Sequence, residues 1–279
     1  MRDQKEGRII QNSPDKIRLH SVRKRSRFGT LRSVSALMLR EMSSTYGRSP
    51  GGYIWAILEP MLGIALLTLI FSIGFRSPRL GTNFPIFYAT GLLPFLMFMT
   101  VSNKMGQAIN YSRQLLAYPR VTFVDTLIAR MVLAVLTSLI VSALILTGIL
   151  LAFETRTTLV LPQILLAFTM AAALGIGIGT LNCLLISMFP VWQQAWSIFT
   201  RPLFLVSGVI FIYEAVPMPY QDWIWYNPLM HVTGVMRAAF YFSYEAVYVS
   251  LIYVFAISFS TGALGLVLLR RFHRDIQEL

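Results

Sequence analysis

The sequence predicts an all-α integral membrane protein with six transmembrane helices. Six long hydrophobic stretches, nearly free of charged residues, fill the chain between Tyr53 and Leu269. A helix needs about 20 apolar residues to cross about 30 Å of hydrocarbon, and residues 53–75, 131–153 and 246–269 clearly exceed that length. These stretches are apolar on every face, whereas strands of a membrane barrel alternate apolar and polar positions over about ten residues. Hydrophobic residues make up 56% of the chain, more than the half that is typical of soluble domains.

The placement of the basic residues predicts the orientation. Half of the 24 Lys and Arg residues precede Tyr53, and most of the others follow the second span or Leu269. Because basic residues accumulate on the cytoplasmic side, we expect both termini to be cytoplasmic and the number of spans to be even. Residues 1–27 are predicted to form a basic, disordered tail that touches anionic lipid or a partner protein. The alternative, a nucleic-acid site, is disfavoured because the positive charge follows the membrane topology.

The segment before the first span has the pattern of an amphipathic helix. In residues 28–46, apolar side chains recur at helical spacing opposite Arg32, Arg40 and Glu41. Such a helix is expected to lie on the inner membrane face. The first 30 residues lack an apolar core of the secretory type, so we expect residues 53–75 to act as an uncleaved insertion signal.

The remaining elements follow from hydropathy and from helix-breaking residues. Residues 84–101 form the second predicted span, and Pro94 is expected to kink it. Residues 103–120 are polar and long enough for a short cytoplasmic helix. The third, fourth and fifth spans are expected at 131–153, 159–189 and 191–213. Within the fourth, three glycines permit close helix approach: Gly175, Gly177 and Gly179.

Residues 214–244 form an unusual external segment. They are rich in Trp, Tyr and Phe and contain a second apolar run, 229–242, which is too short to span a bilayer. Trp and Tyr rings prefer the membrane interface. This pattern predicts a re-entrant or interfacial helical hairpin before the last span.

The residue types present argue against an enzyme. His20, His231 and His273 fall in three separate regions, and Cys183 is the single cysteine, so neither a metal site nor a disulfide is expected. We find no spacing that suggests a Ser-His-carboxylate triad and no glycine-rich phosphate-binding loop ending in Gly-Lys-Ser or Gly-Lys-Thr. Work against a gradient would therefore need a separate ATPase polypeptide or an ion gradient.

Charged side chains inside apolar spans are the main candidates for function. Glu59 and Arg201 each cost roughly 2.5–3.5 kcal/mol at a bilayer centre, so both should face protein or a water-filled path. One interpretation is that each residue lines a pathway or acts in gating. The alternative is that each forms a structural ion pair or extends its side chain to the membrane interface. Asp125 and Arg130, at the inner edge of the third span, are read as a topology anchor and local partner rather than a switch.

Two tryptophans also permit two interpretations. Trp192 and Trp196 lie one turn apart near the inner end of the fifth span. The simpler interpretation is that they anchor the helix at the membrane interface. The alternative is that their faces stack on sugar rings.

The chain contains several motifs that can be compared with known families. The most specific is the run Gly-Tyr-Ile-Trp-Ala-Ile-Leu-Glu-Pro at 52–60. This run resembles the first-span signature of the membrane subunits of capsular polysaccharide exporters, which are ABC transporters of the ABC-2 type. Further motifs occur in the same order as in that family: Arg40-Glu41, Gly-Leu-Leu-Pro-Phe at 91–95, Asp-Thr-Leu-Ile-Ala-Arg at 125–130 and Asn-Pro-Leu-Met-His-Val at 227–232. The resemblance covers about residues 37–269.

The resemblance implies how such a subunit would work. Residues 28–279 would form an ABC-2 type transmembrane domain that pairs with a second copy and with two ATPase subunits, which carry ATP and Mg. The load would be a lipid-linked acidic polysaccharide, passed to periplasmic and outer-membrane export proteins from the bacterial inner membrane. Residues 103–120 would be the ATPase-coupling segment, with docking residues Arg40, Glu41, Ile109, Tyr111, Arg113, Leu115 and Leu116. The predicted substrate path comprises Trp55, Glu59, Phe95, Trp192, Trp196 and Arg201.

The sequence therefore favours a polysaccharide export permease that is a transport subunit and not an enzyme. One alternative is the same machine with another load, such as O-antigen, teichoic acid or a drug. A membrane-embedded enzyme acting on lipid-linked sugar is less favoured, because no acid, base or metal cluster is visible. A secondary transporter is weaker still, because few ionisable residues lie within the spans.

Overall fold

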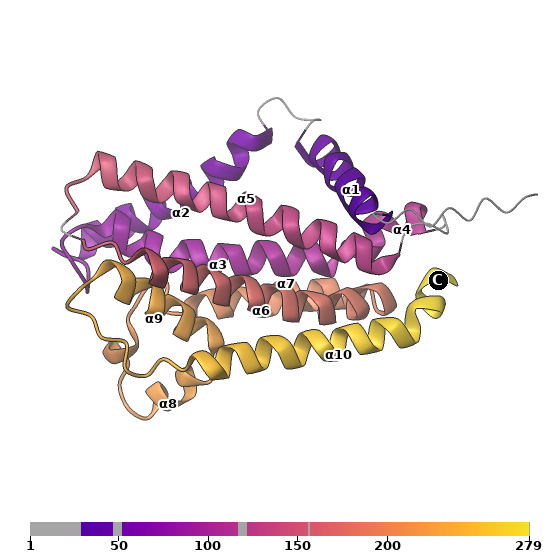
Figure 1. Ribbon diagram of the computed structural model, residues 1–279. Helices are drawn as coiled ribbons and strands as arrows, with labels where there is room; N and C mark the ends of the chain where they lie inside the picture. The colour runs from indigo at the N-terminus through magenta and orange to yellow at the C-terminus, as the bar shows by residue number, and fades with distance from the viewer. Residues whose placement is uncertain (1–28, 47–51, 117–121, 156, 279) are drawn as a thin grey trace, which may run out of the picture.

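The computed structural model describes residues 29–46, 52–116, 122–155 and 157–278, and within these ranges it contains helices and no strand (Figure 1). The predicted basic tail, residues 1–27, lies outside the described ranges. The helices are α1 (Gly29–Tyr46), α2 (Gly52–Gly74), α3 (Phe84–Gly106), α4 (Ala108–Leu116), α5 (Phe123–Ala152), α6 (Leu161–Met188), α7 (Val191–Val206), the 3-10 turn η1 (Tyr213–Ala215), α8 (Tyr220–Trp225), α9 (Pro228–Phe240) and α10 (Leu251–Glu278).

Within the described ranges, five helices are long and apolar enough to cross a membrane: α2, α3, α5, α6 and α10. They coincide with five of the six predicted spans. The remaining span, predicted at 191–213, begins as expected, but α7 contains only 16 residues and ends at Val206. The chain cannot continue as a regular helix because Gly208 adopts a left-handed conformation with φ of +72°.

The core of the bundle is formed by α3 and α6, which have the most buried membrane-type segments. On one side α6 packs against α10, and on the other α2 and α5 pack against α3. The predicted role of the glycines in α6 is confirmed. A Cβ on Gly175 would lie 2.9 Å from Val101 of α3, and one on Gly177 would lie 2.2 Å from the Ser258 carbonyl of α10. Only glycine permits both helices to approach so closely.

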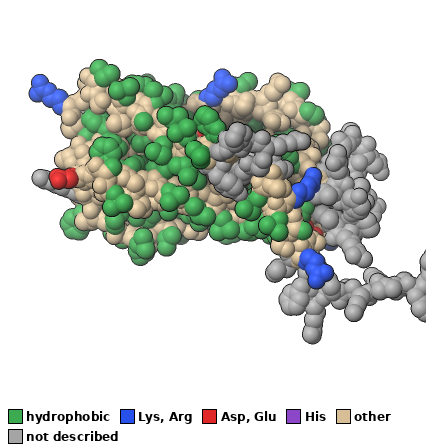
Figure 2. Space-filling view, turned by 90° about the horizontal axis from the view of Figure 1, so that it is seen from above, with side chains coloured by type: hydrophobic (Ala, Val, Ile, Leu, Met, Phe, Trp, Pro, Cys, Tyr) green, Lys and Arg blue, Asp and Glu red, His purple; other side chains and the backbone are tan. Residues whose placement is uncertain are grey.

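The two ends of the bundle carry different elements. The helices α1 and α4 and the end of α10 lie at one end, whereas α8 and α9 lie at the other (Figure 1). Elements predicted to be cytoplasmic therefore share one end. Figure 2 shows hydrophobic side chains across the middle of the face that carries α5, with Lys and Arg side chains at its margins. This distribution suits a molecule surrounded by lipid.

The short apolar run in the external segment folds as α9, which is buried against α3 and α6. Its last residues accept hydrogen bonds from the end of the connection between α5 and α6, since the Val160 N–H donates to the Ala239 carbonyl at 3.0 Å. The preceding α8 is exposed, with Trp223 78% accessible. The aromatic residues at this end thus divide between a buried helix and an exposed one.

Candidate functional site

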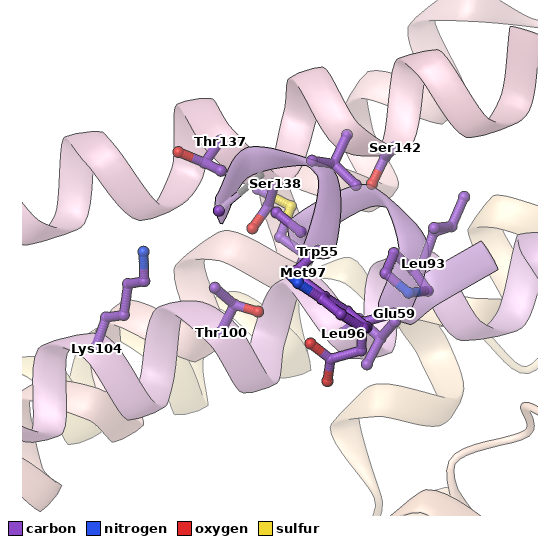
Figure 3. Close-up of a pocket in the computed structure, with 14 residues that line it drawn as sticks. Trp55, Glu59, Leu93, Leu96, Met97, Thr100, Lys104, Thr137, Ser138 and Ser142 are labelled. Atoms are coloured by element: carbon purple, nitrogen blue, oxygen red, sulfur yellow. The ribbon is translucent and has the colours of Figure 1, made fainter. Parts of the chain in front are cut away.

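A cavity of about 310 Å³ lies between α2, α3 and α5 (Figure 3). Trp55 and Glu59 line it from α2, as their spacing of one helical turn requires. Its other polar walls come from α3 and α5: Thr100, Lys104, Thr137, Ser138 and Ser142. A chamber with an indole, a carboxylate, an ammonium and several hydroxyls can hold water or the hydroxyl groups of a sugar.

Glu59 remains exposed in the single chain, and so does the Trp55 indole, which is 60% accessible. The next residue, Pro60, is buried inside α2. The carboxylate therefore lies on the face of α2 that the rest of this chain leaves uncovered. The exposed face leaves room for further protein or water beside Glu59, so its predicted position beside protein or a water-filled path stays a prediction.

The other predicted path residues do not line this cavity. Phe95 is buried and meets the ring of Phe204 of α7 edge-on, with ring centroids 5.3 Å apart. Arg201 is exposed on α7. The single chain thus brings Trp55 and Glu59 together but separates them from Phe95 and Arg201.

Trp192 and Trp196 attach α7 to the bundle. The Trp192 indole N–H donates to the Asn182 side-chain oxygen of α6 at 3.0 Å, and Trp196 donates to the Asn103 side-chain oxygen of α3 at 3.2 Å. These bonds give both indoles a structural role near one end of α7. The role in the substrate path stays a prediction.

A second cluster lies at the end of the bundle that carries α1 and α4. The Arg130 Nε of α5 forms an ion pair with the Glu41 carboxylate of α1 at 3.1 Å, and the two side chains are only 7% and 13% exposed. The same guanidinium donates from Nη1 to the Lys104 carbonyl of α3 at 3.0 Å. It also lies over the Tyr111 ring of α4, 4.3 Å from the centroid. Arg130 therefore joins four helices.

This cluster includes part of the predicted coupling set. Arg40, Glu41 and Tyr111 line one small cleft together with Arg130. Tyr111 is 65% exposed and available to a partner, whereas Ile109 is 5% exposed and packs into the core of this chain. The side chains of Arg113, Leu115 and Leu116 lie outside the described part of the structure.

Asp125, which the sequence placed with Arg130 at the inner edge, has a different partner. Its carboxylate accepts from the Thr122 N–H, and its own N–H donates to the Thr122 hydroxyl, forming a capping box at the start of α5. It therefore acts as a local helix cap. The ion-pair partner of Arg130 comes instead from α1, a contact that hydropathy could not reveal.

The sequence did not identify Arg237, which falls within the segment 214–244 that it predicts to be external. Arg237 lies within α9 and is 1% exposed. A lone Arg inside the apolar run 229–242 was the available signal, because a buried guanidinium requires several hydrogen-bond acceptors. Among the described residues, no three His, Cys, Asp or Glu side chains gather in a way that could hold a metal ion.

Comparison with known proteins places this chain among transporters. A family model described as ABC-2 type transporter matches residues 32–241. The chain is 32% identical over 238 residues to the polysialic acid transport protein KpsM of Escherichia coli, which covers 85% of this chain and 92% of that protein. It is 26% identical to the capsule polysaccharide export inner-membrane protein CtrC of Neisseria meningitidis and 24% identical to BexB of Haemophilus influenzae, each over 88% of this chain and 93% of the relative.

Proposed function

We propose, from the premise that this chain belongs to the ABC-2 type transporter family, that it is the permease subunit of an ATP-driven exporter. Its load would be a lipid-linked capsular or related surface polysaccharide, carried across the bacterial inner membrane. The observation that carries the proposal is similarity over most of the chain to three proteins named for polysialic acid transport or capsule polysaccharide export. The chain is accordingly a transport subunit and not an enzyme.

The exposed polar face of α2 supports assembly with a second copy. A carboxylate facing lipid costs roughly 2.5–3.5 kcal/mol, yet Glu59 is exposed in the single chain. Apolar side chains of α7 are also uncovered, including Ile198 and Phe199 at 63% and 61% accessibility. A homodimer that encloses a path between its two copies would remove Glu59 from lipid and cover α7.

We further propose six spans with both termini in the cytoplasm. The sixth crossing would consist of α7 together with the irregular segment that follows it, since 16 helical residues span only about 24 Å. With α8 and α9 at the external end, α1 and α4 face the cytoplasm. This orientation agrees with the basic residues near α1 and at the end of α10.

The cluster around Arg130 supports the coupling role of α4. A separate ATPase pair, carrying ATP and Mg, would dock on α4 and displace it. Arg130 belongs to α5 and contacts α1, α3 and α4. A displacement of Tyr111 would therefore reach α3 and α5, which line the polar cavity. Export would then continue through periplasmic and outer-membrane proteins that receive the polysaccharide.

The function is tested by deleting the gene in its own bacterium and measuring surface and intracellular polysaccharide. We expect surface polysaccharide to disappear, lipid-linked polysaccharide to accumulate inside, and the intact gene to restore export. Co-purification of the ATPase with this chain should give two copies of each. Unchanged surface polysaccharide in the deletion strain would refute the proposal.

A second load is favoured by one specific observation. Over 85 residues the chain is 34% identical to the O-antigen export system permease protein RfbA of Myxococcus xanthus, although this match covers 30% of the chain. Analysis of the accumulated glycan decides between the two loads. If lipid-linked O-antigen accumulates while the capsule stays normal, the substrate is O-antigen and not capsular polysaccharide.

A further inference from the structure

The irregular segment after α7 is buried without the hydrogen bonds of a helix. Ser207 and Val209 have no accessible surface, and Gly208 is in the left-handed conformation. Buried backbone carbonyls must find donors, and at membrane depth water does not supply them. The donors for this segment must therefore come from side chains of other elements.

Side chains of α9 and its N-cap provide these donors. The Asn227 amide donates to the Val206 carbonyl at 3.0 Å, and the Thr233 hydroxyl lies 3.0 Å from the Ser207 carbonyl oxygen. Arg237 donates from Nη2 to the Val209 carbonyl at 3.0 Å and from Nη1 to the Phe211 carbonyl. Four carbonyls between positions 206 and 211 are thus bound by three residues of one short helix and its cap.

The fit around this segment leaves little room for independent movement. The Arg237 guanidinium lies 4.3 Å from the centroid of the Phe87 ring of α3. A Cβ on Gly91 of α3 would lie 2.9 Å from the Val209 Cα, and one on Gly208 would lie 2.5 Å from the Met230 sulfur. Interfaces packed this closely shift as units rather than deform continuously.

We infer that residues 206–211 and α9 form one unit, the α7–α9 clasp, and that Arg237 is the positioning residue that holds it together. A displacement of α7 would then be transmitted to α9, which packs against α3 and α6. Its consequence for transport rests on the proposed function. When α7 moves during export, the whole clasp would move and open the external end of the path.

Arg237→Lys tests the inference because the ammonium keeps the charge but cannot reach both carbonyls in the planar geometry of a guanidinium. The reporter is Val209→Cys in a chain whose single cysteine, the buried Cys183, is replaced by Ser. We expect Arg237→Lys to raise the rate of maleimide labelling of the reporter by about tenfold. Loss of one charge-assisted hydrogen bond should make local opening of the segment about ten times more frequent. A matched reporter at Val247, which is 87% exposed, should label equally in both backgrounds.

A second readout separates positioning from general destabilisation. In the complex with its ATPase, Arg237→Lys should retain assembly and basal ATP hydrolysis, while export per ATP falls by about tenfold. If this variant does not reach the membrane, Asn227→Ala, which removes one donor from the same clasp, undergoes both measurements. Equal labelling of the Val209 reporter with and without the substitution would overturn the clasp. If instead the parent protein exports no polysaccharide, the proposed function fails while the labelling result still decides the clasp.

Discussion

The Glu41 carboxylate of α1 and the Arg130 guanidinium of α5 form a buried ion pair with an N–O distance of 3.1 Å. The pair joins the amphipathic helix to a candidate span at the point where Arg130 also contacts α3 and α4. Because removing one partner leaves a buried charge without its counter-ion, the effect of each single substitution should exceed that of reversing both.

We predict that Glu41→Gln destabilises the detergent-solubilised protein by about 3 kcal/mol, since it leaves Arg130 buried without a carboxylate. The double variant Glu41→Arg/Arg130→Glu should recover part of that loss. Thermal unfolding of the single and double variants measures the interaction. Strictly additive effects would show that the pair contributes no coupling.

The polar cavity gives a prediction for transport. Trp55→Ala and Glu59→Ala should lower export by about tenfold or more with normal membrane insertion, because both side chains line the chamber. Ile54→Ala is the matched control, since Ile54 is 66% exposed on the same helix and does not line the chamber. Surface polysaccharide is the measurement. Wild-type export from both cavity variants would favour a structural role for Glu59.

The coupling segment gives a separate prediction. Tyr111→Ala removes the exposed ring beneath Arg130, whereas Tyr111→Phe keeps the cation–π contact, which is worth roughly 0.5–1 kcal/mol at exposed sites. Tyr111→Ala should therefore weaken ATPase binding or uncouple export with basal hydrolysis retained, and Tyr111→Phe should affect export less. The combined change of Tyr111, Arg113 and Leu115 to Ala should abolish export.

Thr82→Ala, in an exposed loop at the opposite end of the bundle, is the control for these variants. ATPase co-purification and export are measured together. Normal assembly and export after the triple change would show that α4 is not the coupling site and would favour α1 instead.

Membrane orientation can be tested with cysteine probes in the Cys183→Ser background. A membrane-impermeant reagent added to spheroplasts should label Ser77→Cys, in the connection between α2 and α3, and miss Ser43→Cys, on α1. Both positions are exposed, and the connection between α2 and α3 lies at the end of the bundle opposite α4, whereas α1 is predicted to lie on the cytoplasmic face. Permeabilised cells should label both positions. Labelling of Ser43→Cys in intact spheroplasts would show that the orientation is opposite to the proposed one.

The burial of His231 leads us to predict that the stability of the protein depends on pH. The side chain has no accessible surface and bridges two backbone groups, with Nε2 2.8 Å from the Trp225 carbonyl and Nδ1 accepting from the Ser250 N–H at 3.1 Å. Burial lowers the pKa of His231 below its ordinary value of 6.5. The unfolded chain therefore takes up the proton first, so stability present above about pH 6.5 should be lost as the pH falls through the lower folded pKa.

The measurement is thermal unfolding between about pH 8 and pH 5, compared with His231→Gln, whose amide can both donate and accept but does not titrate. The wild type should lose more stability than His231→Gln over this range. Parallel pH profiles would show that His231 has the same pKa in the folded and unfolded states, which would contradict the predicted effect of its burial.

Local properties of the sequence determined much of the architecture. Length and hydropathy identified the long apolar helices, the spacing of polar residues identified α1, and residues 103–120 contained α4 as expected. Trp55 and Glu59 could be assigned to one cavity because one helical turn separates them. Each of these features depends on residues within a single segment, so each is visible in the chain itself.

Tertiary packing decided the features that join distant segments. The sequence paired Arg130 with neighbouring Asp125, but the fold pairs it with Glu41, because α1 packs against α5 while Asp125 caps its own helix. The early end of α7 likewise depends on α9, whose Arg237 binds carbonyls that a longer helix would have bonded internally. Periodicity and hydropathy describe one helix at a time, whereas a buried charge takes its partner from whichever helix packing brings within reach.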